Sequence, residues 1–233
     1  MGREPELIQG AIEIDVAGEQ IWLLPQRALW WRARRTLLVA DVHLGKCQAY
    51  RASGVPIPGA VLDADLASLS ALIAQTRAER LIVLGDLIHA RVGLSPEVVQ
   101  RVAIWRAQNP LPFELVPGNH DGDASRLPDT WAIVLREEVS PEAPFVLRHT
   151  PAEDPRGYVL CGHLHPAVHI GPMRLPCFHF GARIGILPAL SVFTGTALVQ
   201  PDPADRVYLV APDRVTPAPR RPQRGRSRRT LPA

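Results

Sequence analysis

The stretch LIVLGDLIH, residues 81–89, joins a run of large aliphatic residues to a glycine, a carboxylate and an imidazole. A short aliphatic run of this kind predicts a strand that is buried on both faces. Four other stretches repeat the pattern of an aliphatic run followed by polar residues: TLLVADVH (36–43), FELVPGNHD (113–121), FVLRH (145–149) and YVLCGHLH (158–165). The sequence therefore predicts five buried strands that each end in polar side chains.

Two stretches between these runs have the spacing of amphipathic helices. In SPEVVQRVAIWRAQNP, residues 95–110, Ser95 is placed to cap a helix, Pro96 to occupy its first position, and Asn109 with the proline after it to end the helix. In the other stretch, aliphatic residues recur at spacings of four, three and four: Leu62, Leu66, Leu69 and Ile73. The alternation of strands and helices predicts an α/β core.

The regions before Thr36 and after His169 contain short strand-like pieces broken by glycine and proline. They are AIEIDV (11–16), QIWLL (20–24), ALWWR (28–32), ARIGIL (182–187), LSVFTG (190–195), TALVQP (196–201) and RVYLV (206–210). Together with the five runs, these are more strands than one parallel sheet needs. We therefore expect an α/β fold in which two sheets pack as a β-sandwich.

The length and composition of the chain indicate its class. With 233 residues, 46% of them hydrophobic, the chain is long enough to bury one substantial core. Its three cysteines are too few and too scattered for a disulfide framework, and its first ten residues contain no apolar signal segment. The longest apolar runs are far shorter than a membrane span. We expect a soluble, reduced, cytoplasmic protein with no membrane partner.

Charge is distributed unevenly along the chain. Residues 214–233 contain seven arginines and no acidic residue, whereas residues 1–213 contain 19 arginines and lysines against 23 acidic residues. The final segment is also rich in proline and poor in large apolar side chains, which predicts disorder. We expect one domain over residues 1–213 and a disordered basic tail over residues 214–233. Nucleic acid is the most obvious partner of such a tail, and a solvated tail without a ligand is the alternative.

Polar side chains follow each of the five predicted strands. They are Asp41, His43, Asp86, His89, Asn119, His120, Asp121, His149, His163 and His165. Each of these residues alone is better explained as a turn former or a structural histidine. However, six of the eight histidines in the chain occupy these strand ends. Because ligands of open α/β sheets bind beyond the carboxyl ends of the strands, we expect one rim of a sheet to collect these groups as a site.

The types of ligand at this rim indicate a class of metal. Imidazole, carboxylate and amide groups without a thiolate suit Mn²⁺, Fe²⁺ or Zn²⁺ better than they suit a structural thiolate zinc site or an all-oxygen Mg²⁺ or Ca²⁺ site. Cys161 in CGHLHP has no CxxC-type spacing, so we interpret it as the last buried residue of its strand. The number of candidate ligands is too large for one ion. Two ions bridged by a carboxylate would account for it.

The blocks DVH, GDLIH, GNHD, a lone histidine after a strand and GHLH, in this order, resemble the five signature blocks of the calcineurin-like metallophosphoesterase superfamily. The resemblance implies a two-sheet sandwich flanked by helices and a centre with two divalent metal ions. It implies that one metal is held by Asp41, His43 and His165, that the other is held by Asn119, His149 and His163, and that Asp86 bridges them. It also implies that His120 lies beside the scissile phosphate, as a general acid or as a donor to the phosphate oxygens.

The reaction expected of such a centre follows from charge. Two divalent cations lower the pKa of a bridging water from 15.7 toward about 7, so that hydroxide is available at neutral pH without a side-chain base. The hydroxide would attack phosphorus in line with the leaving group. The metals, Asn119 and His120 would stabilise the negative charge that develops on the phosphate oxygens. Asp86, Asn119 and His120 are therefore the residues that we expect to be catalytic.

A narrower resemblance concerns the substrate. ADVHLGK, GDLIHAR, PGNHD and CGHLHPAV are most similar to the bacterial ligase-associated DNA damage response endonucleases. These are small, manganese-preferring phosphodiesterases associated with a helicase, an exonuclease and an ATP-dependent DNA ligase. The resemblance implies that the substrate is DNA, that the metal is Mn²⁺, and that the partners are proteins of the same repair pathway.

Three further residues are candidates for substrate binding. Lys46, the only lysine in the chain, lies three residues after His43 and is placed to reach a phosphate, whereas the alternative is an ordinary surface lysine. His89 either supports the metal ligands or faces the substrate. Arg148 precedes His149 in a strand and is either buried or in contact with the substrate. The stretch RALWWRARR (27–35) either grips a nucleic acid strand by charge and stacking or forms a hairpin with one buried face.

Two other classes of function remain open on the sequence. A small-molecule phosphodiesterase or a nucleotide-sugar-lipid pyrophosphatase would use the same metal centre, but a lipid substrate favours an exposed apolar cap, and none stands out in the sequence. A non-catalytic scaffold with this fold is disfavoured, because all eight signature positions are filled by metal-binding or phosphate-facing side chains.

Overall fold

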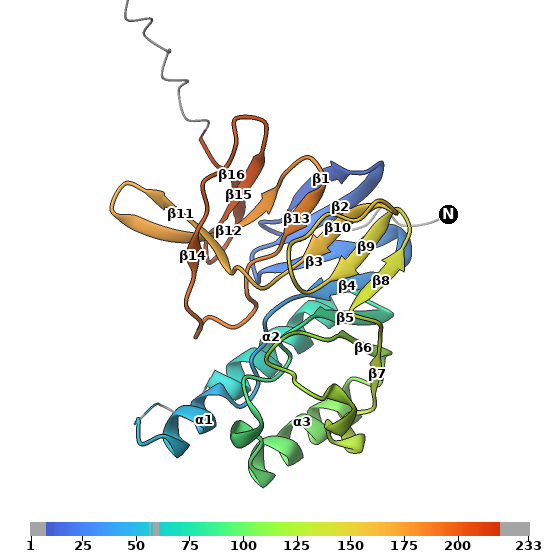
Figure 1. Cartoon of the computed structure of the whole chain (residues 1–233), viewed down its shortest axis with the longest axis vertical. Coiled ribbons are helices and arrows are strands. Elements are labelled where there is room, and N and C mark those ends of the chain that lie inside the picture. The colour runs from blue at the N-terminus through green and yellow to red at the C-terminus, as the bar shows by residue number, and fades with distance from the viewer. Residues whose placement is uncertain (1–7, 56, 58–60, 220–233) are drawn as a thin grey trace, which may run out of the picture.

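A computed structural model describes residues 8–55, 57 and 61–219 of the chain. Two sheets face each other, and the helices pack on the outer side of one of them (Figure 1). The α-helices are α1 (Lys46–Ala52), α2 (Val61–Thr76) and α3 (Pro96–Gln108), and short 3₁₀ turns occupy Arg32–Arg34, Arg91–Gly93, Ala124–Arg126 and Asp129–Trp131. The expected α/β fold with two packed sheets is confirmed.

The first sheet has its seven strands in sequence order. They are β1 (Ile12–Val16), β2 (Glu19–Leu24), β3 (Ala28–Trp31), β4 (Thr36–Val39), β5 (Arg80–Leu84), β6 (Phe113–Val116) and β7 (Ile133–Leu135). The pairs from β1 to β4 are antiparallel, and those from β4 to β7 are parallel. The parallel half of this sheet directs the carboxyl ends of β4, β5 and β6 to the same edge.

The second sheet has nine strands in the order β14-β11-β12-β13-β10-β9-β8, with β15 beside β12 and β16 beside β15. They are β8 (Val139–Glu142), β9 (Phe145–Arg148), β10 (Tyr158–Cys161), β11 (Pro166–Ile170), β12 (Met173–Phe180), β13 (Ile184–Ile186), β14 (Ala197–Leu198), β15 (Arg206–Val210) and β16 (Val215–Pro217). Strands β9, β10 and β13 are parallel. The two predicted runs that end in histidines, β9 and β10, therefore belong to this sheet and not to the first.

Alternation along the central strands produces two hydrophobic layers. Leu81 and Val83 of β5 pack toward α2 and α3, whereas Ile82 and Leu84 pack toward the second sheet. All four side chains are fully buried. The prediction that these runs are buried on both faces is confirmed, and this burial fixes the strand ends from which the polar side chains project.

The two predicted helices form where the sequence indicates them. The Ser95 side chain accepts a hydrogen bond from the backbone N–H of Val98 at 3.3 Å, Pro96 occupies the first position, and Asn109 ends α3. Helix α2 includes the aliphatic residues that predict it and buries Leu62, Leu66 and Leu69. Helix α1, which has a single buried residue, gives no comparable signal.

The stretch RALWWRARR forms a hairpin with buried aromatic residues. Trp31 is fully buried between the sheets, and Trp30 is buried on the helix side. Arg27 donates hydrogen bonds to backbone carbonyls of Ala189 and Ser191. Because both indoles belong to the core, the alternative in which they stack on a nucleic acid strand is wrong.

Two boundaries differ from the expectation. Residues 190–195, expected to be strand-like, form a loop, and Arg27 donates hydrogen bonds to the carbonyl of Ser191 in this loop and to that of Ala189 just before it. The fold also continues past residue 213, since β16 pairs with β15 and Val215 is buried. The rest of the predicted basic tail, residues 220–233, lies outside the described residues. Among the described residues, no helix combines the length and apolar character needed to cross a membrane.

Candidate metal centre

The candidate ligands come from the strand ends of both sheets. Asp41 and Asp86 lie two residues after β4 and β5, and Asn119 follows β6. His149 directly follows β9, and His163 lies two residues after β10. The expectation of one rim of one sheet is therefore corrected, because β9 and β10 form part of the facing sheet and the carboxyl ends of the two parallel sets meet.

The first group of candidate ligands consists of Asp41, His43 and His165. The Nε2 atom of His165 lies 3.4 Å from Nε2 of His43 and 3.2 Å from Oδ1 of Asp41. Asp41 is fully buried and His43 is 4% exposed. These three residues are the ones that the family resemblance assigns to one metal.

The second group consists of Asp86, His149 and His163, with Asn119 beside them. The Nε2 atom of His149 lies 2.9 Å from Oδ1 of Asn119, 3.0 Å from Nδ1 of His163 and 3.4 Å from Oδ2 of Asp86. Four potential ligand atoms thus converge around one point. The family resemblance assigns Asn119, His149 and His163 to the second metal and Asp86 to both metals.

The hydrogen bonds and pKa values of the histidines in the two groups indicate whether a cation fits between them. In each group one imidazole donates from Nδ1 to a backbone carbonyl: His149 to Leu84 at 3.0 Å and His165 to Gly195 at 2.9 Å. In the neutral form, their Nε2 atoms then carry lone pairs that face carboxylate oxygens and other imidazole nitrogens. Burial also lowers the pKa of His43 to about 3, so this ring is neutral at pH 7. Burial lowers the pKa values of His149 and His165, but the hydrogen bonds and charges of Asp86 and Asp41 outweigh it and raise both. Each group therefore attracts positive charge, which fits a divalent cation.

The two carboxylates are oriented by the backbone of neighbouring loops. Oδ1 of Asp86 accepts a hydrogen bond from the backbone N–H of His120 at 2.8 Å, and Oδ2 of Asp41 accepts one from the backbone N–H of His163 at 3.0 Å. The charge of Asp86 also acts on both His43 and His149, one from each group. Asp86 thus belongs to the second group, where its Oδ2 lies 3.4 Å from Nε2 of His149.

Asp121 supports the loops that carry the ligands, a role that the sequence does not indicate. Its carboxylate is fully buried and accepts hydrogen bonds from the backbone N–H groups of Asp86, Ile88 and Gly118, at 2.8 to 3.1 Å. Burial raises the pKa of this carboxyl, while the backbone hydrogen bonds lower it. The signal in the sequence is its place at the end of GNHD, directly after Asn119 and His120.

Five of the candidate ligands have left-handed backbone conformations. Their φ angles lie between 46° and 70°, in a region that side chains of L-residues rarely adopt: Asp41, His43, Asp86, His163 and His165. Gly85 extends this pattern with φ of +80°, and a Cβ atom at this position would collide with the ring of His149. Strained backbone that the surrounding fold imposes is typical of functional sites.

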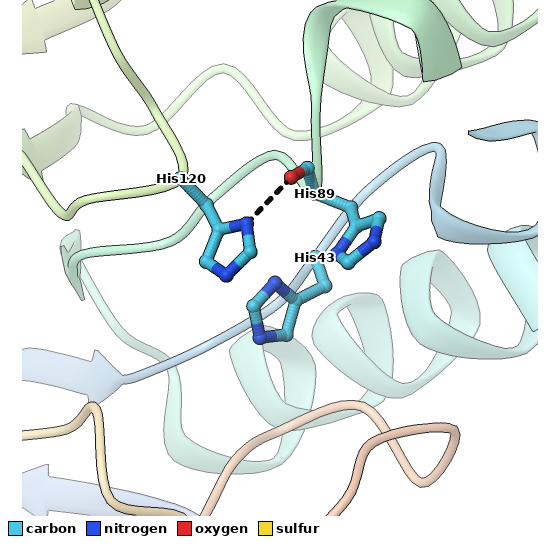
Figure 2. Close-up of side chains that lie close together, drawn as sticks. All are labelled: His43, His89 and His120. Carbon is cyan, nitrogen blue, oxygen red and sulfur yellow. Dashed lines mark hydrogen bonds between the residues drawn. The ribbon is translucent and has the colours of Figure 1, made fainter.

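A third group of imidazoles lies next to the first and shares His43 with it. Figure 2 shows the rings of His43, His89 and His120 close together, with Nδ1 of His120 donating to the carbonyl of His89 at 2.7 Å. The rings of His89 and His120 stack with centroids 5.1 Å apart. His120 is exposed, and Figure 2 shows its second ring nitrogen pointing away from this carbonyl. This group forms the open side of the centre.

The remaining candidates lie at different distances from the centre. Lys46 begins α1, is half-buried, and its charge lowers the pKa values of both His43 and His89. Arg148 instead bonds to its own loop, through the carbonyl of Ala152 and the hydroxyl of Thr150. Cys161 is fully buried at the end of β10, so its interpretation as a core residue is confirmed.

Comparisons with known proteins agree with this geometry. The family model described as calcineurin-like phosphoesterase matches residues 34–206. The solved nuclease MPE of Pseudomonas putida has 38% sequence identity to the chain and a TM-score of 0.79, over 89% of this chain and all of that one. The phosphoesterase Yfce of E. coli, at 19% identity and a TM-score of 0.41 over 76% of this chain and 87% of that one, is too distant to add to the argument. No curated protein matches the chain.

The matched region contains every residue of the three imidazole and carboxylate groups. The family match and the metal-ligand groups indicate the same chemistry. The chain therefore belongs to the calcineurin-like phosphoesterase family, as a metal-dependent hydrolase of phosphoester bonds.

Proposed function

We propose that this protein is a DNA endonuclease with two divalent metal ions, most favourably Mn²⁺, and that it acts in DNA repair. The observation that carries the proposal is the pair of ligand groups, Asp41 with His43 and His165 and Asp86 with His149 and His163, at the strand ends where the two sheets meet. The similarity to the Pseudomonas putida nuclease over nearly the whole chain supports a nucleic acid substrate.

Each group would hold one ion. Asp41, His43 and His165 form one site, and Asn119, His149 and His163 form the other. Asp86 would contribute to both, since its charge acts on an imidazole of each group. When bound, the two ions supply an activated water as nucleophile and neutralise the charge of the phosphate.

His120 is the residue that we assign to the leaving group. Its Nδ1–H is held by the carbonyl of His89 at 2.7 Å, which fixes the orientation of the ring. The exposed Nε2, once it carries a proton, would donate that proton to the leaving oxygen or a hydrogen bond to a phosphate oxygen. Asn119 would assist by orienting the phosphate at the second site.

Several side features agree with DNA as substrate and Mn²⁺ as metal. Lys46, half-buried beside His43 and His89, would add positive charge where a phosphate binds. The mixed imidazole and oxygen ligands suit Mn²⁺, with Fe²⁺ or Zn²⁺ as alternatives. The basic segment that follows β16 would add affinity for the phosphate backbone.

The wider setting of the protein is also proposed. The family resemblance points to an ATP-dependent DNA ligase, a helicase and an exonuclease as partners in the same pathway. The cysteines Cys47, Cys161 and Cys177 are all free and buried, which agrees with action in the reducing cytoplasm.

The first alternative is a phosphodiesterase of small molecules, or a nucleotide-sugar-lipid pyrophosphatase, with the same centre. A non-catalytic scaffold is disfavoured because the ligand groups are complete. The nuclease relative, at 38% identity, favours DNA over a small molecule or a lipid.

The test is manganese-dependent nicking of supercoiled plasmid, measured beside hydrolysis of bis-p-nitrophenyl phosphate. We expect both activities, and we expect His120→Ala to lower plasmid nicking by about 100- to 10,000-fold. His169→Ala is the matched control, because His169 is an exposed histidine outside the three groups. Hydrolysis of the small diester without nicking under any divalent metal would favour the small-molecule alternative.

A further inference from the structure

Two aromatic side chains lie beside the imidazoles on the open side of the centre. Tyr50 of α1 stacks on His89, with ring centroids 5.7 Å apart and an interplanar angle of 17°. Phe193, in the loop of residues 190–195, meets the ring of Tyr50 edge-on, with centroids 6.4 Å apart. Since His89 stacks in turn on His120, a continuous series of rings leads from Tyr50 to the phosphate-facing histidine.

This aromatic pair contributes little to the hydrophobic core. Tyr50 remains 37% exposed, and Val192 next to Phe193 is 70% exposed. Neither Tyr50 nor Phe193 belongs to the buried clusters that hold the helices and sheets together. Apolar rings at the open side of a charged centre are therefore available to a ligand.

The spacing along α1 matches the parts of a nucleotide. Lys46 and Tyr50 are four residues apart, so they lie on the same face of the helix, about 6 Å from each other along its axis. The backbone N–H of Lys46 donates to the carbonyl of His43 at 3.2 Å, so α1 begins beside the centre. A base that lies one sugar away from a phosphate at the centre would reach the ring of Tyr50.

We propose that Tyr50 and Phe193 form a platform that stacks an unpaired nucleobase flanking the scissile phosphate. The ligand class is thus a nucleotide unit whose base is free of its partner strand, because a paired base has its faces covered by its neighbours. The inference rests on the proposed function, and adds to it a site that selects nucleotides over simple phosphodiesters.

The platform is fixed to the rest of the protein by the loop that contains Phe193. The backbone N–H of Phe193 donates to Oγ of Ser191, and this hydroxyl donates to the buried carboxylate of Asp65 at 2.9 Å. The same loop presents the carbonyl of Gly195 to His165 at 2.9 Å. The loop thus contains Phe193 and also accepts a hydrogen bond from His165, a candidate metal ligand. This contact fixes the position of the platform relative to the centre.

The test compares esters with and without a base. The substrates are the p-nitrophenyl esters of thymidine 5′-phosphate and thymidine 3′-phosphate, and the matching esters of 1,2-dideoxyribose, which carry the same leaving group and no base. For at least one of the two positions, we expect the wild-type protein to prefer the base-bearing ester in kcat/KM by about 5- to 150-fold, the range of stacking on one aromatic side chain. The ratio should fall toward one in Tyr50→Ala and persist in Tyr50→Phe.

Two further measurements separate stacking from a structural role of Tyr50. Phe193→Ala should lower the same ratio, whereas Ile104→Ala, an exposed aliphatic residue of α3, should leave it as in the wild type. In a His120→Ala background, the fluorescence of 2-aminopurine in a single-stranded oligonucleotide should be quenched on binding and should recover when Tyr50 is also replaced by Ala.

Three results would contradict the inference. If Tyr50→Ala lowered the kcat/KM of both kinds of ester by the same factor, Tyr50 would only position His89. If the wild-type ratio were one at both positions while plasmid was still nicked, the platform would be wrong and the endonuclease assignment would stand. If the wild type hydrolysed neither ester and did not nick plasmid, the proposed function would fail, and the platform with it.

Discussion

The buried carboxylate of Asp121 holds the backbone of Asp86 in place, through a hydrogen bond of 2.9 Å from the Asp86 N–H to Oδ2. The same oxygen accepts from Gly118, and the other oxygen accepts from Ile88. One side chain thus joins the turn after β5 to the turn after β6. The position of the proposed bridging ligand depends on a residue that does not itself face the metals.

Asp121→Asn should therefore weaken the centre without removing a ligand. The amide NH₂ of asparagine would face a backbone N–H group that now finds a carboxylate oxygen, which leaves a buried donor unpaired at a cost of about 1 to 3 kcal/mol. We expect metal affinity to fall by about 10- to 100-fold, as is usual when a group that orients a ligand is lost. Urea unfolding with a chelator and calorimetric Mn²⁺ titration would measure the two effects. Asp129→Asn, at an exposed aspartate, is the control and should change neither.

Asp86→Ala should abolish activity, because the proposed bridging carboxylate contributes to both metal sites. Metal content after dialysis should fall below two ions per chain, and turnover of bis-p-nitrophenyl phosphate should reach the background rate. An Asp86→Ala protein that binds two metals and retains wild-type turnover would overturn the assignment of the centre.

Gly85→Ala should displace His149 as well as strain the backbone. The φ of Gly85 is +80°, and its added Cβ would meet the imidazole of His149. Gly18→Ala is the matched control, because Gly18 has φ of +82° with open space around it, so it carries the backbone strain alone. Both variants should lose about 1 kcal/mol of stability from the conformation, but only Gly85→Ala should lose metal binding. Equal metal affinity in the two variants would contradict the close packing of Gly85 on His149.

Removal of metal should lower the stability of the fold. The two ligand groups bring together imidazoles and carboxylates from both sheets, so ions that bind them favour the folded chain over the unfolded one. At a free Mn²⁺ concentration of about 100 times the dissociation constant, one site contributes about 2.7 kcal/mol. The melting temperature should fall in EDTA and recover with Mn²⁺, and Asp86→Ala should show a smaller recovery. A melting temperature that does not respond to Mn²⁺ would argue against metal binding by the native fold.

The stability of the protein should also depend on pH through Asp65. Burial raises the pKa of this carboxyl from 3.8 to about 6, against the hydrogen bond from Ser191 and the charge of Arg27. Since the folded chain then binds the proton more tightly than the unfolded chain, the contribution of Asp65 to stability declines as the pH rises from about 4 to about 6.

Asp65→Asn should remove this dependence. Relative to the wild type, the variant should gain stability across the same pH interval, by an amount of the order of 2 kcal/mol when the carboxylate is fully ionised. Urea unfolding at several pH values with a chelator present would measure the difference. Asp63→Asn, on the same helix but exposed, is the control and should parallel the wild type. A difference between Asp65→Asn and the wild type that stays constant from about pH 4 to about pH 8 would contradict the raised pKa.

Much of the fold could be predicted because its signals are local. The aliphatic run at Leu81–Leu84 needs only burial to become a strand, and Ser95 caps α3 through a bond to a residue three positions away. By contrast, residues 190–195 have the composition of a strand but form a loop, and the contacts of this segment, such as that of Ser191 with Arg27, are with residues distant in the sequence.

The residues of the centre could be predicted from the sequence more readily than their arrangement in space. The residue types in the five blocks indicate a metal site, but the strand order that brings β9 and β10 to face β4 and β5 depends on contacts between distant parts of the chain. The support that Asp121 gives to Asp86 links residues 35 positions apart, and no local pattern encodes such a bond. The aromatic contact of Tyr50 with Phe193 is likewise invisible in the sequence.

The left-handed conformations of Asp41, His43, Asp86, His163 and His165 have a consequence for transfer of this chemistry to other proteins. A designer who copied only the ligand identities onto a scaffold with ordinary strand ends would aim the side chains elsewhere, because each left-handed residue redirects its own Cα–Cβ bond. A design that transfers this centre would therefore have to reproduce the left-handed backbone conformations after the strands as well as the ligand residues.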